Sequence, residues 1–182
     1  MNFWFDEDGV LVVYEPHAYK GDNPLYLRKG EHYFASLVPD NKMITVTKKL
    51  QEKMNEQDNL YILTTVSPLG DMFTEQVKDK KEWLRLRAPH IDVDTNFFPS
   101  VSDKRDMAAM LMGSTARTLS KKDVLIDDWN PNLQMWEKHG GTAIKYLNGI
   151  NSADSWAGLK ITEEMTADEI VEMLLSLDVP SF

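Results

Sequence analysis

The feature that most constrains the fold is a set of short apolar runs separated by segments of helical pattern. The runs "NLYILTTV" at 59–66 and "DVLID" at 123–127 are bounded by polar residues. Such runs are typical of strands that are covered on both faces, as in parallel sheets. Because strands that alternate with helices favour a parallel arrangement, we predict an α/β fold. Its expected form is a three-layer, Rossmann-like fold with a mostly parallel central sheet.

The rest of the sequence extends this alternation. The helix near the C-terminal end is expected to begin with a capping box, because Thr166 is followed three residues later by Glu169. The length of 182 residues suits a single domain, 1–182. We expect further strands at 2–6, 91–98 and 141–147, with 10–13 as a loop or a second short strand. Further helices are expected at 45–57, from Asp71 to Arg87, from Ser102 or Asp103 to Met112, and at 132–138.

Composition excludes several classes of protein. The chain has no cysteine, which rules out disulfides and thiolate metal sites. Its net charge is -9 and it has no dense Lys/Arg cluster, so we do not expect it to bind a nucleic-acid polymer. No stretch is apolar enough for a transmembrane helix, and the first residues, "MNFWFDEDG", do not read as a signal peptide. We expect a cytoplasmic protein without a membrane partner, and a homodimer is compatible with the sequence.

Two acidic clusters each follow an apolar run directly. Asp6 and Asp8 lie at the end of the strand at 2–6, and Asp127 and Asp128 lie at the end of the strand at 123–127. Taken alone, either cluster is typical of residues that close turns or cap helices. In a parallel sheet, however, both clusters would lie at the carboxyl edge, where open α/β sheets bind ligands. Converging carboxylates need a cation, and their hard oxygen ligands suit Mg²⁺.

Candidate phosphate ligands lie at the same predicted edge. Thr64 and Thr65 lie near the end of the strand at 59–66, shortly before a helix begins. Lys104 lies at the start of another helix. Hydroxyls, backbone N–H groups at a helix start and one ammonium group can together hold a phosphate. Each residue alone is more typical of an ordinary strand end or a solvated lysine.

These motifs, in this order, resemble those of the haloacid dehalogenase-like (HAD) phosphatase superfamily. They are "DEDGV" at 6–10, the threonines of "LTTVSP", Lys104, and "LIDD" at 125–128. The segments "HYFASLVPDNKM", "KKEW" and "SDK" are most similar to the 5'(3')-deoxyribonucleotidase family of that superfamily. The resemblance covers most of residues 3–135.

The resemblance implies a function and a set of catalytic roles. It implies a Mg²⁺-dependent phosphomonoesterase, a 5'-nucleotidase that hydrolyses nucleoside monophosphates. Asp6 would be the nucleophile that becomes an aspartyl phosphate. Asp8 would be the general acid and then the general base, and would reach the metal through its backbone carbonyl. Asp128 would be the second carboxylate ligand of the metal, with Asp127 supporting it.

The resemblance also implies phosphate ligands and a cap. Lys104 and one threonine would bind the phosphate; an extra residue within "LTTVSP" leaves Thr64 and Thr65 as candidates, and we choose Thr64. The segment 14–44 is rich in Pro and Gly and falls where the superfamily inserts a small cap. Its Tyr and Phe residues would either stack on a nucleobase or form the cap's own core.

Two departures from the family pattern bear on the substrate. Glu7 occupies a position that the family usually fills with an apolar residue, and Trp129 stands where related nucleotidases often have a basic residue. Two alternatives therefore stay open: a HAD phosphatase that acts on another small phosphoester such as a sugar phosphate, and a catalytically silent relative that binds a phosphorylated ligand.

Overall fold

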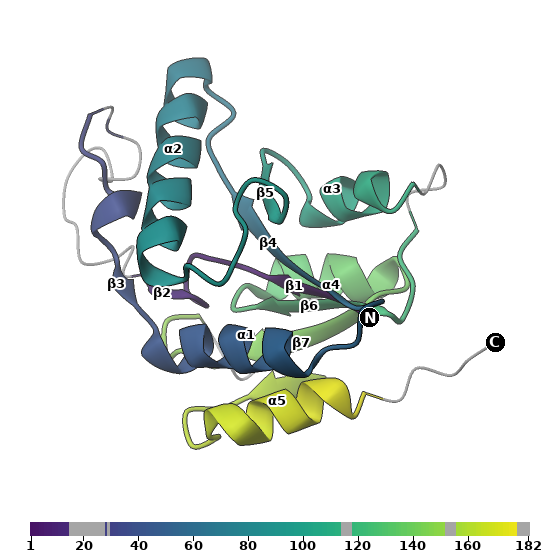
Figure 1. The fold of residues 1–182 in the computed structure, drawn as a ribbon. Coiled ribbons are helices and arrows are strands. Elements are labelled where there is room, and N and C mark those ends of the chain that lie inside the picture. Colours follow the sequence, from purple (N-terminus) through teal and green to yellow (C-terminus); the bar gives the residue numbers. More distant parts are fainter. Residues whose placement is uncertain (15–27, 29, 114–117, 152–155, 178–182) are drawn as a thin grey trace.

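Six parallel strands form the centre of the computed structural model, which describes residues 1–14, 28, 30–113, 118–151 and 156–177 (Figure 1). Every pair of neighbouring strands in this sheet is parallel. The predicted α/β fold with a mostly parallel sheet is confirmed. The strands, in their order across the sheet, are β5 (Phe97–Ser100), β4 (Asn59–Thr65), β1 (Asn2–Phe5), β6 (Asp123–Asp127), β7 (Thr142–Tyr146) and β8 (Leu159–Ile161).

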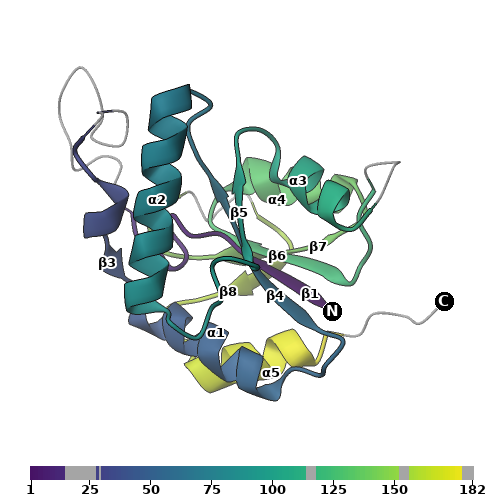
Figure 2. The same ribbon diagram turned by 45° about the horizontal axis from the view of Figure 1, so that its top comes forward.

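Helices cover both faces of the sheet, so the fold has three layers: helices, sheet and helices (Figure 2). One face packs against α1 (Asn41–Lys53), α2 (Gly70–Arg87) and α5 (Ala167–Leu175), and its core includes Phe5, Ile62 and Ile126. The other face packs against α3 (Lys104–Leu111) and α4 (Asn130–Lys138), and its core includes Trp4, Leu63 and Leu125. Neighbouring residues of one strand thus serve opposite cores, as the period of two along a strand requires.

The predicted strand at 91–98 is wrong over most of its length. Residues 91–96 form turns, and β5 begins only at Phe97. The carboxylate of Asp92 accepts hydrogen bonds from the backbone N of Asp94 (3.0 Å) and from Thr95 Oγ1 (2.9 Å). Such Asx bonds stabilise a turn. The apolar alternation of Ile91 and Val93 misled the prediction, because these two side chains enter the core from a loop.

Helix boundaries shift where capping decides them. Helix α1 begins four residues before the expected Thr45, since Asp40 is its N-cap and accepts from the backbone N of Met43 (3.0 Å). Asp71 was expected to cap α2, but it lies in the first turn and the N-cap is Leu69. The capping box of Thr166 and Glu169 and the capping of α3 by Asp103 are confirmed. Strand β8 was not predicted, because three residues carry too little pattern.

The expected cap segment is described only in part. Residues 15–27 and 29, which include Tyr19 and Tyr26 of the aromatic residues expected in the cap, lie outside the described residues. The described part contains a two-stranded antiparallel ribbon, β2 (Val12–Val13) and β3 (Val38–Pro39), and the short helix η2 (Phe34–Ser36). His32 Nδ1 lies 2.9 Å from Asp79 Oδ1 of α2. Trp83 Nε1 of α2 donates to the carbonyl of Leu37 (2.7 Å). These contacts fasten the described part of the segment to α2. Residues 41–44 belong to α1.

Among the helices that the structure describes, none is long and apolar enough to span a bilayer.

Candidate active site

Three buried carboxylates meet at the carboxyl edge of the sheet. Asp6 directly follows β1, Asp127 ends β6 and Asp128 is the next residue. Parallel pairing continues past the end of β1, where the backbone N of Asp6 donates to the carbonyl of Ile126 (2.9 Å). Each of the three carboxylates offers an oxygen within 4.8 Å of those of the other two. Residues more than a hundred positions apart are therefore close enough to share one ion.

Lys104 lies between two of these carboxylates. Its Nζ is 2.7 Å from Asp6 Oδ1 and 2.8 Å from Asp127 Oδ2. Asp103 caps α3 and so places Lys104 at the first helical position, where its side chain is buried at the sheet edge. Burial alone would lower the pKa of Lys104, but the charges of Asp127 and Asp6 outweigh it and raise the pKa. The ammonium group therefore stays charged inside the site.

Asp128 is held by a segment that follows β7. Its Oδ2 accepts from the side-chain amides of Asn148 and Asn151, each at 2.7 Å. The buried Lys145 donates to the backbone carbonyl of Asp128. Burial, with the neighbouring charge of Asp127 adding to it, raises the pKa of Asp128 to about 6. Hydrogen bonds therefore hold the Asp128 carboxylate in place, but the positive charge around it is too small to offset the effect of burial on its pKa.

The whole edge shows the same shortage of positive charge. Burial raises the pKa of Asp6 well above its usual value, even though Lys104 opposes the shift. Five carboxylates face three ammonium groups, so the ionised cluster would carry two excess negative charges. A divalent cation that is bound by oxygen ligands would cancel them, and the donor set therefore fits Mg²⁺. The carboxylates belong to Asp6, Glu7, Asp8, Asp127 and Asp128, and the ammonium groups to Lys80, Lys104 and Lys145.

Asp8 contacts a different lysine. The fully buried Lys80 of α2 places its Nζ 2.7 Å from Asp8 Oδ1, 3.3 Å from Glu7 Oε2 and 4.0 Å from the ring centre of Phe34. Asp8 therefore lies beside the three grouped carboxylates, with its own cation. Glu7, which departs from the family pattern, is buried as well. Burial raises its pKa to about 7 although Lys80 opposes the shift.

The two candidate threonines lie in different surroundings. Side chains alternate along β4, so Thr65 shares the face of Leu63, which is also the face of Trp4 and Asp6. Thr65 is exposed and lines a cavity of about 280 Å³, together with Asp8, Tyr14, Phe34, Val66, Ser67, Pro68 and Gln76. Thr64 is fully buried, and its Oγ1 has no hydrogen-bond partner among the residues that the structure describes. Thr65 is therefore open to the cavity, whereas Thr64 offers a buried hydroxyl at the sheet edge, and the choice of Thr64 as the phosphate ligand stays a prediction.

Sequence reasoning assigned no role to four residues of this site. Lys80 was visible only as part of "KKEW", where alternate helical positions could equally face solvent. Lys145 lies within an apolar strand, and a lysine inside a buried strand is a signal that we could have used. Asn148 and Asn151 belong to a loop whose sequence shows no recognisable motif.

Comparisons with known proteins agree with this architecture. The scan against protein-family models and the search of curated proteins found no match. Sixteen chains of solved structures match. One is a D,D-heptose 1,7-bisphosphate phosphatase from Burkholderia thailandensis, with a TM-score of 0.61, 11% identity, and coverage of 96% of this chain and 98% of that chain. Another is a haloacid dehalogenase-like hydrolase from Streptococcus pneumoniae, with a TM-score of 0.59, 13% identity, and coverage of 94% and 97%. This chain therefore has the fold of HAD-like phosphatases over almost its whole length.

Proposed function

We propose that this protein is a Mg²⁺-dependent phosphomonoesterase that forms an aspartyl phosphate on Asp6. The observation that carries the proposal is the meeting of Asp6, Asp127 and Asp128 within 4.8 Å, with Lys104 bridging two of them. The HAD-like fold supports it, because the cluster lies at the carboxyl edge, where α/β sheets bind ligands. A catalytically silent relative would have no need to keep this costly concentration of buried charge.

Asp6 is oriented for attack on phosphorus. Its Oδ1 accepts from Lys104 and from the backbone N of Glu7, each at 2.7 Å, which fixes the rotation of the carboxylate. The other oxygen, Oδ2, would form the bond to phosphorus as the ester bond breaks. Mg²⁺ held by Asp6, Asp128 and the backbone carbonyl of Asp8, with Asp127 as support, would offset the repulsion between the anionic nucleophile and the anionic ester. Lys104 adds a fixed positive charge beside the transferred group.

Asp8 would move the protons. It lies next to the cavity in which the leaving group would stand, and Lys80 fixes the direction of its carboxyl group. In the first step it would give its proton to the leaving alkoxide. In the second step it would take a proton from the water that cleaves the phosphate from Asp6. Thr65 lies in the same cavity and would bind a phosphate oxygen through its hydroxyl group.

The cavity supports a nucleoside monophosphate as the substrate. Its volume of about 280 Å³ suits a small leaving group. The rings of Tyr14 and Phe34 line it, and such rings can stack on a planar base. The second candidate is a sugar phosphate, which is favoured by the structural likeness to a heptose bisphosphate phosphatase. The two candidate substrates differ in whether the leaving group contains an aromatic base.

A hydrolysis panel tests the proposal. Nucleoside monophosphates and sugar phosphates are incubated with the protein, with and without Mg²⁺, and released phosphate is measured. We expect Mg²⁺-dependent release, fastest with a nucleotide. Asp6→Asn should reduce turnover by about 10⁴-fold or more, because the amide is a poor nucleophile. Asp58→Asn, at the other edge of the sheet, is the control and should keep wild-type turnover.

Each outcome has a clear meaning. If Asp6→Asn retains full activity, the proposed mechanism is wrong. If a sugar phosphate is preferred to every nucleotide, the mechanism stands and the nucleotidase assignment is wrong.

A further inference from the structure

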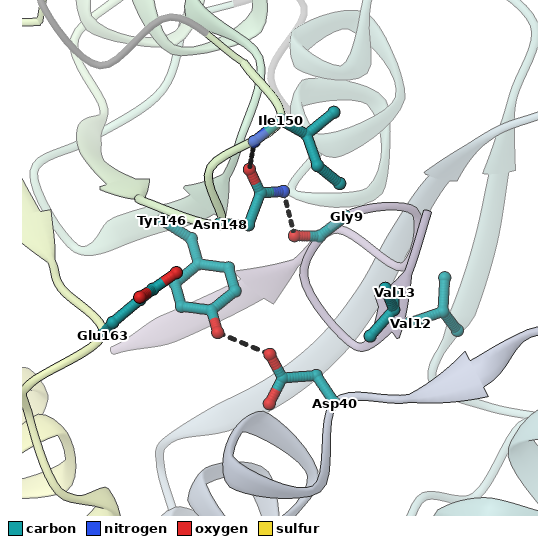
Figure 3. Close-up of a pocket in the computed structure, with 8 residues that line it drawn as sticks. All are labelled: Gly9, Val12, Val13, Asp40, Tyr146, Asn148, Ile150 and Glu163. Carbon is teal, nitrogen blue, oxygen red and sulfur yellow. Dashed lines mark hydrogen bonds between the residues drawn. The ribbon is translucent and has the colours of Figure 1, made fainter. Parts of the chain in front are cut away.

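Asn148 joins the two loops that carry the proposed metal ligands. Figure 3 shows its hydrogen bond to Gly9 in the first loop. Its Nδ2 donates to the carbonyl of Gly9 and to Asp128 Oδ2, each at 2.7 Å. Its Oδ1 accepts from the backbone N of Ile150 at 2.9 Å. An amide group has two N–H donors and one carbonyl. Both sides of the Asn148 amide are therefore engaged, and its orientation is fixed.

The two loops are in direct contact at this point. Gly9 has a φ of +81°, a conformation that other residues rarely adopt. A Cβ atom at Gly9 would lie 2.3 Å from Asp128 Oδ2 and 2.9 Å from Asn148 Nδ2. Only a glycine can therefore let the backbone after Asp8 approach the carboxylate of Asp128 so closely. The amide of Asn148 donates a hydrogen bond to each of the two loops at this point.

The same oxygen of Asp128 accepts a second amide. Asn151 Nδ2 donates to Asp128 Oδ2 at 2.7 Å, as Asn148 does. Two donors on one oxygen fix the rotation of the carboxylate and leave Oδ1 outside this pair of bonds. Asn151 does not share the bond to Gly9. Asn148 is thus the residue that couples the position of Asp128 to the loop after Asp6 and Asp8.

Asn148 also lines a second cavity. This cavity has a volume of about 210 Å³, and Gly9 and Asn148 line it whereas Asp128 does not. On its far side the hydroxyl of Tyr146 donates to Asp40, the N-cap of α1 (Figure 3).

We propose that Asn148 is a positioning residue for the metal: it holds the first loop and Asp128 at the separation that one ion requires. The inference rests on the proposed function, which alone assigns an ion to the site. Carboxylates that face one another repel, so their separation must be fixed before the ion binds. Hydrogen bonds to ligating carboxylates typically change metal affinity by about 10–100-fold.

The test measures Mg²⁺ binding directly, by titration calorimetry and by the Mg²⁺-induced rise in Tm, so it does not depend on turnover. We expect Asn148→Ala to weaken Mg²⁺ binding by about tenfold or more. At saturating Mg²⁺, its KM for the phosphoester should stay within about twofold of wild type, because Asn148 has no contact with the substrate cavity. Asn59→Ala is the matched control: it removes an amide–amide hydrogen bond at the opposite edge and should leave Mg²⁺ binding unchanged.

A second variant separates hydrogen bonding from packing. Asn148→Leu fills nearly the same space but offers no donor, so it should bind Mg²⁺ as weakly as Asn148→Ala. If either folded variant binds Mg²⁺ as tightly as wild type does, the positioning role is wrong. If the wild-type protein itself shows no Mg²⁺ binding, the proposed function fails, and this inference fails with it.

Discussion

The two edges of the central sheet use the same residue type in opposite ways. At the amino edge, Asp123 accepts from Asn2 Nδ2 and from both the backbone N and Oγ of Ser120, each at 2.8 Å. Asp58 accepts from the N-terminal ammonium group and from Asn55. At the carboxyl edge, Asp6 and Asp128 face other carboxylates. Burial does not distinguish the edges, since Asp123 is 4% exposed and Asp6 is 6% exposed.

The difference shows in how readily the carboxylates ionise. Burial acts to raise the pKa of Asp58, but the N-terminal ammonium group and Asn55 outweigh it and lower the pKa. At the carboxyl edge burial prevails, and it raises the pKa of Asp6 and that of Asp128. Carboxylates whose neighbours offset the effect of burial on their pKa serve stability, whereas a buried group of carboxylates with raised pKa values is typical of a functional site. The following variants test this contrast.

The largest effect is expected from Lys104→Met. It removes the ammonium group that Asp6 and Asp127 share, so turnover should fall by about 10³-fold. The metal-free protein should also lose about 3 kcal/mol of unfolding free energy, because two buried carboxylates lose their partner. Activity assays and urea denaturation measure both effects. Lys49→Met breaks the exposed pair with Asp168 and is the control; a stability loss as large as that of Lys104→Met would contradict the contrast.

The second largest effect is expected from Glu7→Gln, in the pH dependence of the free energy of unfolding. The pKa of Glu7 in the folded protein is about 7, above its usual 4.5, so the folded state keeps this proton longer than the unfolded state. Glu7 alone should therefore lower wild-type stability without metal by about 3 kcal/mol as pH rises from about 4.5 through 7, in addition to the declines caused by Asp6 and Asp128. In urea denaturation at pH 5 and pH 8, Glu7→Gln should lose the Glu7 part of the decline and keep the rest. Glu172→Gln, exposed on α5, should keep the whole decline. Equal pH profiles for Glu7→Gln and wild type would refute the interpretation.

The smallest effect is expected at the amino edge. Asp123→Ala leaves the backbone N and hydroxyl of Ser120 without their acceptor, which should cost about 1–3 kcal/mol of unfolding free energy. Turnover and Mg²⁺ binding should remain within about twofold of wild type, since the residue is at the opposite edge from the site. A loss of turnover comparable to that of Asp6→Asn would show that the two edges do not differ in function.

Sequence reasoning was most successful where a motif directly follows a strand. Asp6, Asp127 and Asp128 could be placed at one edge because parallel strands bring their carboxyl ends together, and Lys104 could be placed there by the helix that starts with it. It could not decide between residues where the choice depends on which way a side chain points. Thr64 and Thr65 are adjacent, and only the register of β4 against β1 assigns each to its face.

Tertiary contacts account for the rest. Lys80 comes from α2 and Asn148 from the loop after β7, and neither lies near Asp8 or Asp128 along the chain. A helix places its side chains in all directions, so the sequence of α2 could not show that Lys80 alone would reach Glu7 and Asp8. The loop contact of Asn148 depends on how β7 packs beside β6.

The sequence by itself determined the parallel sheet and the acidic residues at its carboxyl edge, because apolar runs and the polar residues that end them are local properties of the chain. Only the tertiary structure decided which lysine neutralises which carboxylate, which threonine faces the cavity, and which amide holds Asp128. These pairings depend on distances of a few ångströms between segments far apart in sequence, and electrostatic and hydrogen-bond energies change steeply over such distances.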